Sequence, residues 1–158
     1  GTAPRSEGLA LFGRALFLSG DVAGAERMLK EAVATSPRDP EAFGFLADAA
    51  ERLGHDTVAR DALVSLDTLQ GSTVPDDIRG IRSHRIGALS LRAGDPRLAV
   101  TYLTEALNLG RSGIDTLSQL ARAKWLAGDI AGARETLARA LVIDPRNSEL
   151  LRLARAMK

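Results

Sequence analysis

Apolar residues recur along the chain at three- and four-residue spacings, as in helices that bury one face. In three stretches this spacing precedes a glycine. The apolar residues of these stretches are Leu9, Phe12 and Leu16, then Phe43, Leu46 and Ala50, then Leu117 and Leu120. Each glycine is followed by a second stretch with a similar helical spacing. The pattern therefore predicts helices on both sides of short turns and gives no indication of a sheet.

The turns themselves repeat along the sequence. The leading glycines are Gly20, Gly54, Gly94 and Gly128, separated by 34, 40 and 34 residues. "GDVAGAERMLKEAVATSPRD" at 20 returns as "GDIAGARETLARALVIDPRN" at 128. A glycine-rich phosphate loop occurs once in a site, whereas this turn occurs four times. We interpret the glycines as tight turns between helices, where glycine reaches positive φ without strain.

Equivalent positions of the repeats share small side chains. Three columns hold Gly or Ala at eleven of twelve positions: Gly13, Ala47, Gly87, Ala121; Ala25, Ala59, Ala99, Ala133; Ala32, Leu66, Ala106, Ala140. A fourth column is uniformly leucine, at Leu29, Leu63, Leu103 and Leu137. Small residues let paired helices approach closely, so the columns predict the contacts within each pair.

A 34-residue period made of two helices resembles the tetratricopeptide repeat (TPR) family. The resemblance implies an all-α fold, a right-handed α-solenoid of antiparallel helix pairs, with the first helices lining a concave groove. We expect one TPR domain over 1–158, and the chain, which begins Gly-Thr-Ala-Pro, to be a fragment of a longer protein. The expected parts are repeats at about 6–39, 40–73, 80–113 and 114–147, an inserted loop at about 71–79, and a capping helix at 148–158.

Single residues refine this organisation. Asp21, Asp95 and Asp129 stand where helix N-caps belong, and His55 takes that column in the second repeat. We interpret His55 as an exposed turn histidine rather than as a pH-sensing or metal-binding group. Asp76 and Asp77 suit the first turn of a lengthened helix.

Two further details concern the third and fourth repeats and the end of the chain. Ser83, Ser90 and Lys124 replace large apolar residues that the TPR family usually carries. In the capping segment, Leu150, Leu151, Ala154 and Met157 are expected to share the packed face.

Composition excludes several classes of function. The 158 residues include no cysteine and only two histidines, His55 and His84, so thiol chemistry is absent and no metal-ligand spacing exists. No nucleophile or nucleotide motif occurs. A net charge of +1 and the lack of a long apolar run give no indication of nucleic-acid binding or membrane insertion. We expect no enzyme activity, no cofactor and no metal.

The architecture favours a non-catalytic protein–protein interaction module, a scaffold or adaptor that holds a peptide or helix of a partner in its groove. The alternative is a structural module that packs on copies of itself or on the rest of its own polypeptide. The expected groove residues are Arg14, Asp48, Glu51, His84, Arg85, Arg92, Ser118, Arg122 and Trp125. Trp125 is either an aromatic anchor for a ligand or a packing residue beside the capping helix.

Charge is divided unevenly along the chain. Residues 40–73 carry two basic and six acidic residues, whereas residues 80–158 carry thirteen and seven. We therefore expect the third and fourth repeats to bind an acidic segment or a carboxylate terminus, with arginine as a forked donor. The alternative is a solvated face with no partner. Some TPR proteins clamp a carboxylate with Lys or Arg together with Asn, but Asn108 and Asn147 lie outside the first helices, so that clamp is not expected.

The source and the compartment are weakly indicated. Arginine outnumbers lysine 18 to 3 and alanine is abundant, which suggests a GC-rich bacterial genome. The sequence leaves the localisation unknown, with the bacterial cytoplasm and the periplasm as the two candidates.

Overall fold

The computed structural model describes the backbone of residues 2–158 and the side chains of residues 7–158. Within this range the chain is all-α, with no strand. The helices are α1 (Thr2–Ser19), α2 (Val22–Thr35), α3 (Pro40–Arg52), α4 (Asp56–Gln70), the 3-10 helix η1 (Gly71–Thr73), α5 (Asp76–Arg92), α6 (Pro96–Asn108), α7 (Ile114–Leu126), α8 (Ile130–Ile143) and α9 (Ser148–Ala156). The all-α solenoid class expected from the repeat is thus confirmed.

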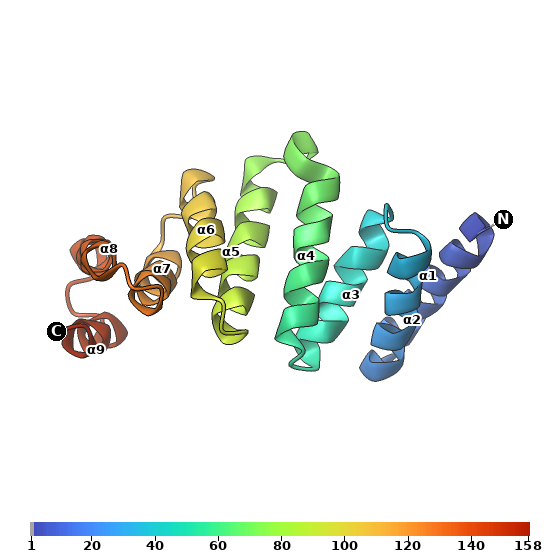
Figure 1. Cartoon of the computed structure of the whole chain (residues 1–158), viewed down its shortest axis with the longest axis horizontal. Helices are drawn as coiled ribbons and strands as arrows, with labels where there is room; N and C mark the ends of the chain where they lie inside the picture. Colours follow the sequence, from blue (N-terminus) through green and yellow to red (C-terminus); the bar gives the residue numbers. More distant parts are fainter. Residues whose placement is uncertain (1) are drawn as a thin grey trace. The chain divides into compact units, whose positions relative to one another are not determined.

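The helices form two compact units, residues 1–73 and residues 74–158. In the first unit α1 pairs with α2 and α3 with α4, and α2 also packs on α3 (Figure 1). In the second unit α5 pairs with α6, α7 with α8, α6 packs on α7, and α9 packs on α8. Each unit therefore contains two successive helix pairs, and the second unit adds one further helix.

The four glycine turns have the geometry that their positions predict. Gly20, Gly54, Gly94 and Gly128 all have positive φ, between 75° and 95°. At the last turn the N–H of Gly128 donates to the Trp125 carbonyl at 3.1 Å, and the N–H of Asp129 donates to the Lys124 carbonyl at 2.9 Å. These bonds satisfy carbonyls at the end of the first helix, so the glycine closes one helix while the next residue starts another.

Aspartate caps the helices that follow three of these turns. The Asp21 carboxylate accepts a bond from the Gly24 N–H at 2.9 Å, and Asp129 accepts the same bond from Gly132 at 2.9 Å. A Cβ at Gly24 or Gly132 would collide with the capping carboxylate, which accounts for the second glycine of "GDVAGA" and "GDIAGA". A negative side chain thus fills the helix N-terminus, the place that a bound phosphate would need.

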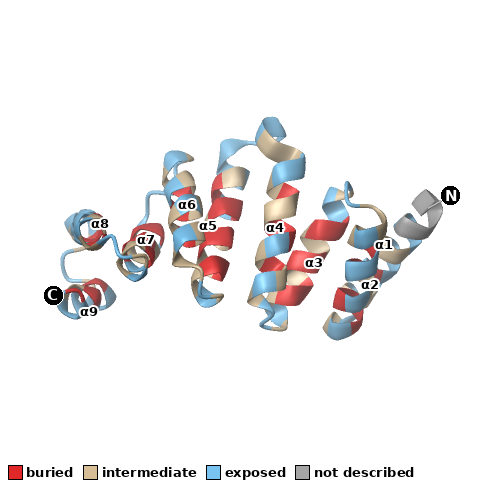
Figure 2. Ribbon diagram, viewed as in Figure 1, coloured by how far each residue is buried: buried red, intermediate tan, exposed pale blue. Residues whose placement is uncertain are grey.

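Close approach within the pairs depends on the small columns. A Cβ added to Gly13 would lie 2.6 Å from Leu29 Cγ, and one added to Gly87 would lie 2.5 Å from Leu103 Cγ. Leu29 and Leu103 are fully buried, and the column Ala25, Ala59, Ala99, Ala133 is 0% exposed throughout. Buried residues accordingly gather on the sides of the helices that face a neighbour (Figure 2).

The six surplus residues between the second and third turns are mostly helical. α4 has 15 residues and is followed by η1, and α5 has 17 residues against 13 in α3 and α7. Asp76 and Asp77 occupy the first turn of α5, as their charge at a helix N-terminus predicts. The segment expected as a loop at about 71–79 is therefore helical again from Asp76.

In the second unit, two of the polar residues that replace apolar ones form hydrogen bonds with nearby groups. The Ser90 hydroxyl is fully buried and donates to the Ile86 carbonyl at 2.6 Å. The Lys124 ammonium reaches the hydroxyl of Thr136 on the paired helix at 2.9 Å, and Thr136 is itself buried. These substitutions keep the packing because each group has an acceptor within reach.

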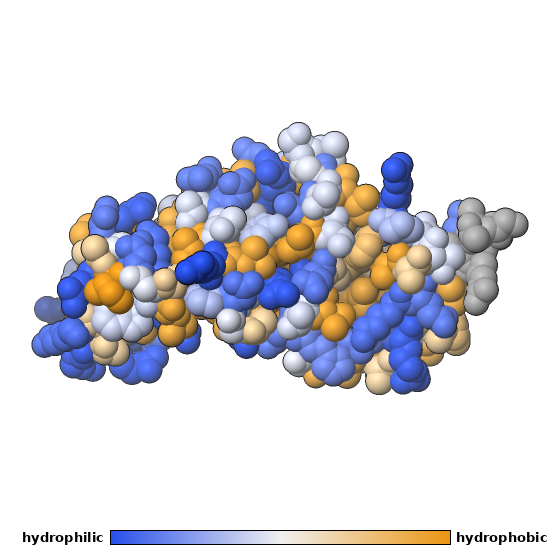
Figure 3. Space-filling model, viewed as in Figure 1, coloured by the Kyte–Doolittle hydropathy of each residue, from blue (hydrophilic) through white to orange (hydrophobic). Residues whose placement is uncertain are grey.

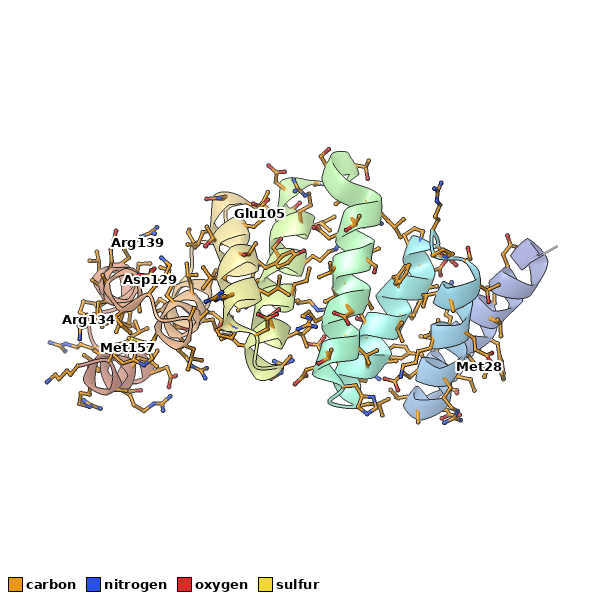
Figure 4. The ribbon with its side chains drawn as sticks, viewed as in Figure 1. Met28, Glu105, Asp129, Arg134, Arg139 and Met157 are labelled. Carbon is orange, nitrogen blue, oxygen red and sulfur yellow. The ribbon has the colours of Figure 1, made fainter. Side chains whose placement is uncertain are left out.

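Helix α9 covers the exposed end of α8. Leu150, Leu153 and Met157 are buried in one cluster with residues of α7 and α8. Arg134 of α8 donates from Nε to the Met157 carbonyl at 3.1 Å, which fixes the end of α9 against α8 (Figure 4). The expectation for Leu151 was wrong: it is 38% exposed, and Leu153, which is 7% exposed, is buried instead.

Replacing Ala133 with Leu should destabilise the second unit by roughly 1–3 kcal/mol, because the added atoms have no space against the paired helix. The matched control is Ala138→Leu on the same helix, where the alanine is exposed. Chemical denaturation of both variants measures the difference. Equal stabilities would show that the alanine column is not a tight contact.

The turn glycines give a second prediction. Gly54→Ala should cost about 1–2 kcal/mol, because φ of +75° strains any residue with a Cβ. Gly44→Ala, in the middle of α3 with open space around its Cβ, should stabilise by about 0.5–1 kcal/mol. Opposite shifts of the melting temperature are the expected result, and shifts of the same sign would contradict this account of the turns.

Candidate binding surface

The nine residues expected to line the groove lie on four helices in two units. Arg14 is on α1, and Asp48 and Glu51 are on α3 of the first unit. The second unit carries His84, Arg85 and Arg92 on α5 and Ser118, Arg122 and Trp125 on α7. Each unit has a surface depression between its two first helices, so the two sets are described separately.

The depression of the first unit lies between α1 and α3 and has a volume of about 210 Å³. Its lining consists of Glu7, Ala10, Leu11, Arg14, Asp39, Glu41, Ala42 and Phe45. Of the predicted residues only Arg14 takes part. Asp48 and Glu51 are half-buried on α3, are not part of this lining, and each has an interaction partner.

Arginines and aromatic rings alternate beside this depression. Arg14 forms an ion pair with Glu41 at 3.0 Å and lies 5.5 Å from the centroid of the Phe45 ring. Phe45 meets Phe17 edge to face at 5.8 Å, and Arg52 lies over the other ring, 4.6 Å from its centroid. Arg14 is thus already engaged on two sides, so the one basic residue that lines this depression is held within the protein.

The depression of the second unit is larger, about 380 Å³. Helix α5 contributes Ala88, Leu91 and Arg92, helix α7 contributes Asp115, Ser118, Gln119, Arg122 and Leu126, and α9 contributes Glu149. Three predicted residues, Arg92, Ser118 and Arg122, come together here. The visible face of each unit carries both hydrophobic and hydrophilic residues (Figure 3).

His84 lies behind this depression and holds one of its acids. Its Nε2 is 3.1 Å from Asp115 Oδ2, and its Nδ1 is 2.9 Å from the hydroxyl of buried Thr116. Gln119 donates to the other Asp115 oxygen at 3.3 Å. This arrangement suits a neutral imidazole, which donates from Nε2 and accepts the Thr116 hydroxyl at Nδ1. Burial lowers the pKa of His84, with Arg111 acting in the same direction and Asp115 against it.

The second acid of the depression is bound as well. Arg152 donates to both oxygens of Glu149, at 2.6 to 3.2 Å. Hydrogen bonding to Arg152 lowers the pKa of Glu149, and the charges of Arg152 and Arg122 add to that effect. Arg122 is exposed, and no hydrogen bond or ion pair within the described residues holds its guanidinium. It is therefore the available donor of this surface.

Two predicted residues lie apart from the depression. Trp125 is half-buried and packs against the cluster formed by α7, α8 and α9, as the packing alternative proposed. Arg85 is half-buried and engaged in another interaction. The residues expected from the sequence did not include Glu149, Gln119 or the apolar wall of Leu91 and Leu126. Glu149 belongs to α9, beyond the four repeats, and its register, which matches that of Glu41, was the one signal that could have placed it here.

The described residues offer no metal site and no membrane-spanning helix. They hold no group of three or more histidine, aspartate or glutamate side chains placed to bind a metal ion. None of the helices in that part of the chain combines the length and the apolarity that a membrane crossing requires.

The lowered pKa of His84 predicts a pH dependence of stability. The folded-state pKa lies below the unfolded value of about 6.5, so the unfolded chain takes up the proton first as the pH falls. The stabilisation that the neutral His84 side chain contributes is complete above the unfolded-state pKa. This stabilisation is lost as the pH falls below the unfolded-state pKa. The melting temperature should therefore decrease between pH 7.5 and 5.5, and His84→Gln should flatten the decrease. An unchanged slope in His84→Gln would contradict the assignment.

Comparison with known proteins identifies the repeat. Tetratricopeptide repeat profiles match residues 11–66 and 90–157. Among solved structures, MamA from Desulfovibrio magneticus RS-1 is 19% identical, with a TM-score of 0.72 over 96% of this chain and 82% of that one. YrrB, a TPR protein described as having an unusual peptide-binding site, is 16% identical, with a TM-score of 0.68 over 90% and 70%.

A third similar structure is that of the APC/C subunits Cut9–Hcn1, with 15% identity and a TM-score of 0.66 over 94% of this chain and 29% of that one. No curated protein sequence matches the chain. At these identities the structural matches show the fold, and the two profiles, which together span most of the repeats, show the family. The chain belongs to the tetratricopeptide repeat family.

Proposed function

We propose that this protein is a non-catalytic interaction module that binds an acidic peptide segment of a partner protein over α5 and α7. The family and its structural relatives support the general class, since TPR proteins are interaction scaffolds. YrrB is described as having a peptide-binding site, and the APC/C subunits were solved as an assembly. The choice of ligand rests on this chain's own residues.

The proposal rests on one observation: in the 380 Å³ depression the acidic side chains are already paired within the protein, whereas Arg122 is not. Both acids are bound internally, Asp115 by His84 and Gln119 and Glu149 by Arg152. Arg122 has no such partner and projects beside Ser118. A ligand carboxylate would therefore meet an available guanidinium, and the geometry of that group favours two parallel bonds to a carboxylate.

The walls of the depression also favour a ligand that has an apolar side chain. Leu91 and Leu126 flank the arginines, and Leu126 is 60% exposed. Covering these side chains would remove apolar surface from water while the carboxylate pairs with Arg122. The preferred ligand is thus an acidic residue next to an apolar one, in an extended or helical segment.

The test uses a displayed library of random peptides selected on the full chain at low salt. Enriched sequences should contain Asp or Glu beside an apolar residue. Arg122→Glu should weaken binding of an enriched peptide by about tenfold or more, because a charge-assisted bond becomes a repulsion. Affinity should also fall as salt rises.

The matched control is Arg139→Glu, the same charge change at an exposed arginine of α8 outside the depression (Figure 4). It should leave the affinity nearly unchanged, which separates the local contact from the change in net charge. Enrichment of neutral or basic peptides would contradict the proposal, as would equal effects of the two reversals.

A further inference from the structure

An arginine and a glutamate occur twice in the same register of the repeat. Arg14 of α1 and Glu41 of α3 are 27 residues apart and form an ion pair at 3.0 Å. Arg122 of α7 and Glu149 of α9 are also 27 residues apart and take the equivalent positions, because α9 continues the register of the first helices. The register of the repeat therefore favours the same ion pair in the second unit.

In the second unit Arg152 binds the carboxylate instead. Through Nε and Nη2 it donates to both oxygens of Glu149, in three contacts of 2.6 to 3.2 Å. In the first unit a single nitrogen of Arg14 reaches a single oxygen of Glu41. A guanidinium that binds both oxygens is the stronger arrangement, and side chains three residues apart on one helix are already neighbours. Glu149 consequently pairs with Arg152 rather than with Arg122.

Arg122 is nevertheless close to Glu149. Both side chains line the 380 Å³ depression, and the charge of Arg122 adds to that of Arg152 in lowering the pKa of Glu149. The backbone at this point is fixed, because Leu150 is fully buried and its N–H donates to the Asn147 side chain at 3.1 Å. The Glu149 side chain itself remains 51% exposed, so its bonds to Arg152, rather than packing, set the direction of the carboxylate.

We infer that Arg152 is a positioning residue of the proposed peptide site, which it keeps open by holding Glu149 away from Arg122. Without Arg152, Glu149 is released to form the pair that Glu41 forms with Arg14. A carboxylate of the protein itself then occupies the guanidinium that the carboxylate of the ligand needs. This inference rests on the proposed function and names the residue that keeps Arg122 available.

Binding of an acidic peptide enriched on the full chain tests the inference. Arg152→Ala should weaken binding about two- to fivefold, the factor that corresponds to one exposed ion pair. The same substitution should have almost no effect in a chain that also carries Glu149→Gln, because the uncharged amide does not compete for Arg122. The quantity that decides is the difference between the two effects of Arg152→Ala, measured as a double-mutant cycle.

The matched control is Arg155→Ala, which removes the same charge from the same helix. Arg155 is exposed and does not line the depression, so its loss should leave the affinity nearly unchanged with or without Glu149→Gln. A lower net charge or a loosened α9 would weaken binding equally in both backgrounds. The cycle therefore separates the release of Glu149 from these two general effects.

A second measurement needs no peptide. Phenylglyoxal modifies accessible guanidinium groups, and peptide mapping by mass spectrometry follows Arg122 by itself. Arg122 should react about two- to fivefold more slowly in Arg152→Ala than in the unsubstituted chain, and at the original rate once Glu149→Gln is added. In the first unit Glu41→Gln should speed the reaction of Arg14, because it removes the equivalent ion pair.

Two results would overturn the inference. The first is an Arg152→Ala effect on peptide affinity that is the same with and without Glu149→Gln. The second is an unchanged reaction rate of Arg122 in Arg152→Ala, which would contradict this inference alone if acidic peptides are still enriched. A library that yields no acidic peptide would contradict the proposed function, and the reaction of Arg122 would still decide whether Arg152 holds Glu149 away from it.

Discussion

Everything in this fold depends on how closely the two helices of a pair approach. The leucine of each second helix projects toward a residue with little or no side chain, most tightly at Leu29 against Gly13 and at Leu103 against Gly87, where even a Cβ would overlap. Packing of that kind leaves almost no tolerance for larger residues, because protein interiors are already close-packed. The positive-φ glycines and the aspartate caps then set where each helix ends and the next begins, so that the leucine arrives opposite its partner.

Much of this was predictable because it repeats. The turn glycines and the small columns recur at spacings of 34, 40 and 34 residues, and aspartate caps three of the four helices that follow the turns. Several occurrences identify a constraint that a single occurrence would not. The prediction failed where the repeat stops. Helix α9 has no later copy to compare with, and its buried residue proved to be Leu153 rather than Leu151. The candidate site was only partly predictable for the same reason. The repeat places Arg92 and Arg122 on first helices of the same unit, but whether a charged group is already paired depends on single residues. His84 has no equivalent histidine in the other repeats, and Arg152 lies on α9, beyond the repeats.

The two depressions show how similar backbones acquire different chemistry. In the first unit Arg14 is held by Glu41 and lies near the ring of Phe45, so its charge is largely used within the protein. In the second unit the acids are held and Arg122 is left available. The position equivalent to Arg14 therefore changes from a paired arginine to one that no hydrogen bond or ion pair of the described residues holds, through its neighbours alone. This is how a repeat fold diversifies: the contacts between helices stay fixed, and the exposed columns vary.

The bond between Lys124 and Thr136 has a consequence for folding fidelity. Helix pairs that resemble one another this closely can exchange partners during folding, which is a characteristic failure of repeat proteins. Lys124 donates to Thr136 on α8, whereas the equivalent residues on α2 and α4 are Met28 and Ala62, which offer no acceptor. Pairing α7 with α2 or α4 would place the ammonium against an apolar side chain and leave it without a bond. One polar contact thus favours the pairing of α7 with α8 over its pairing with α2 or α4.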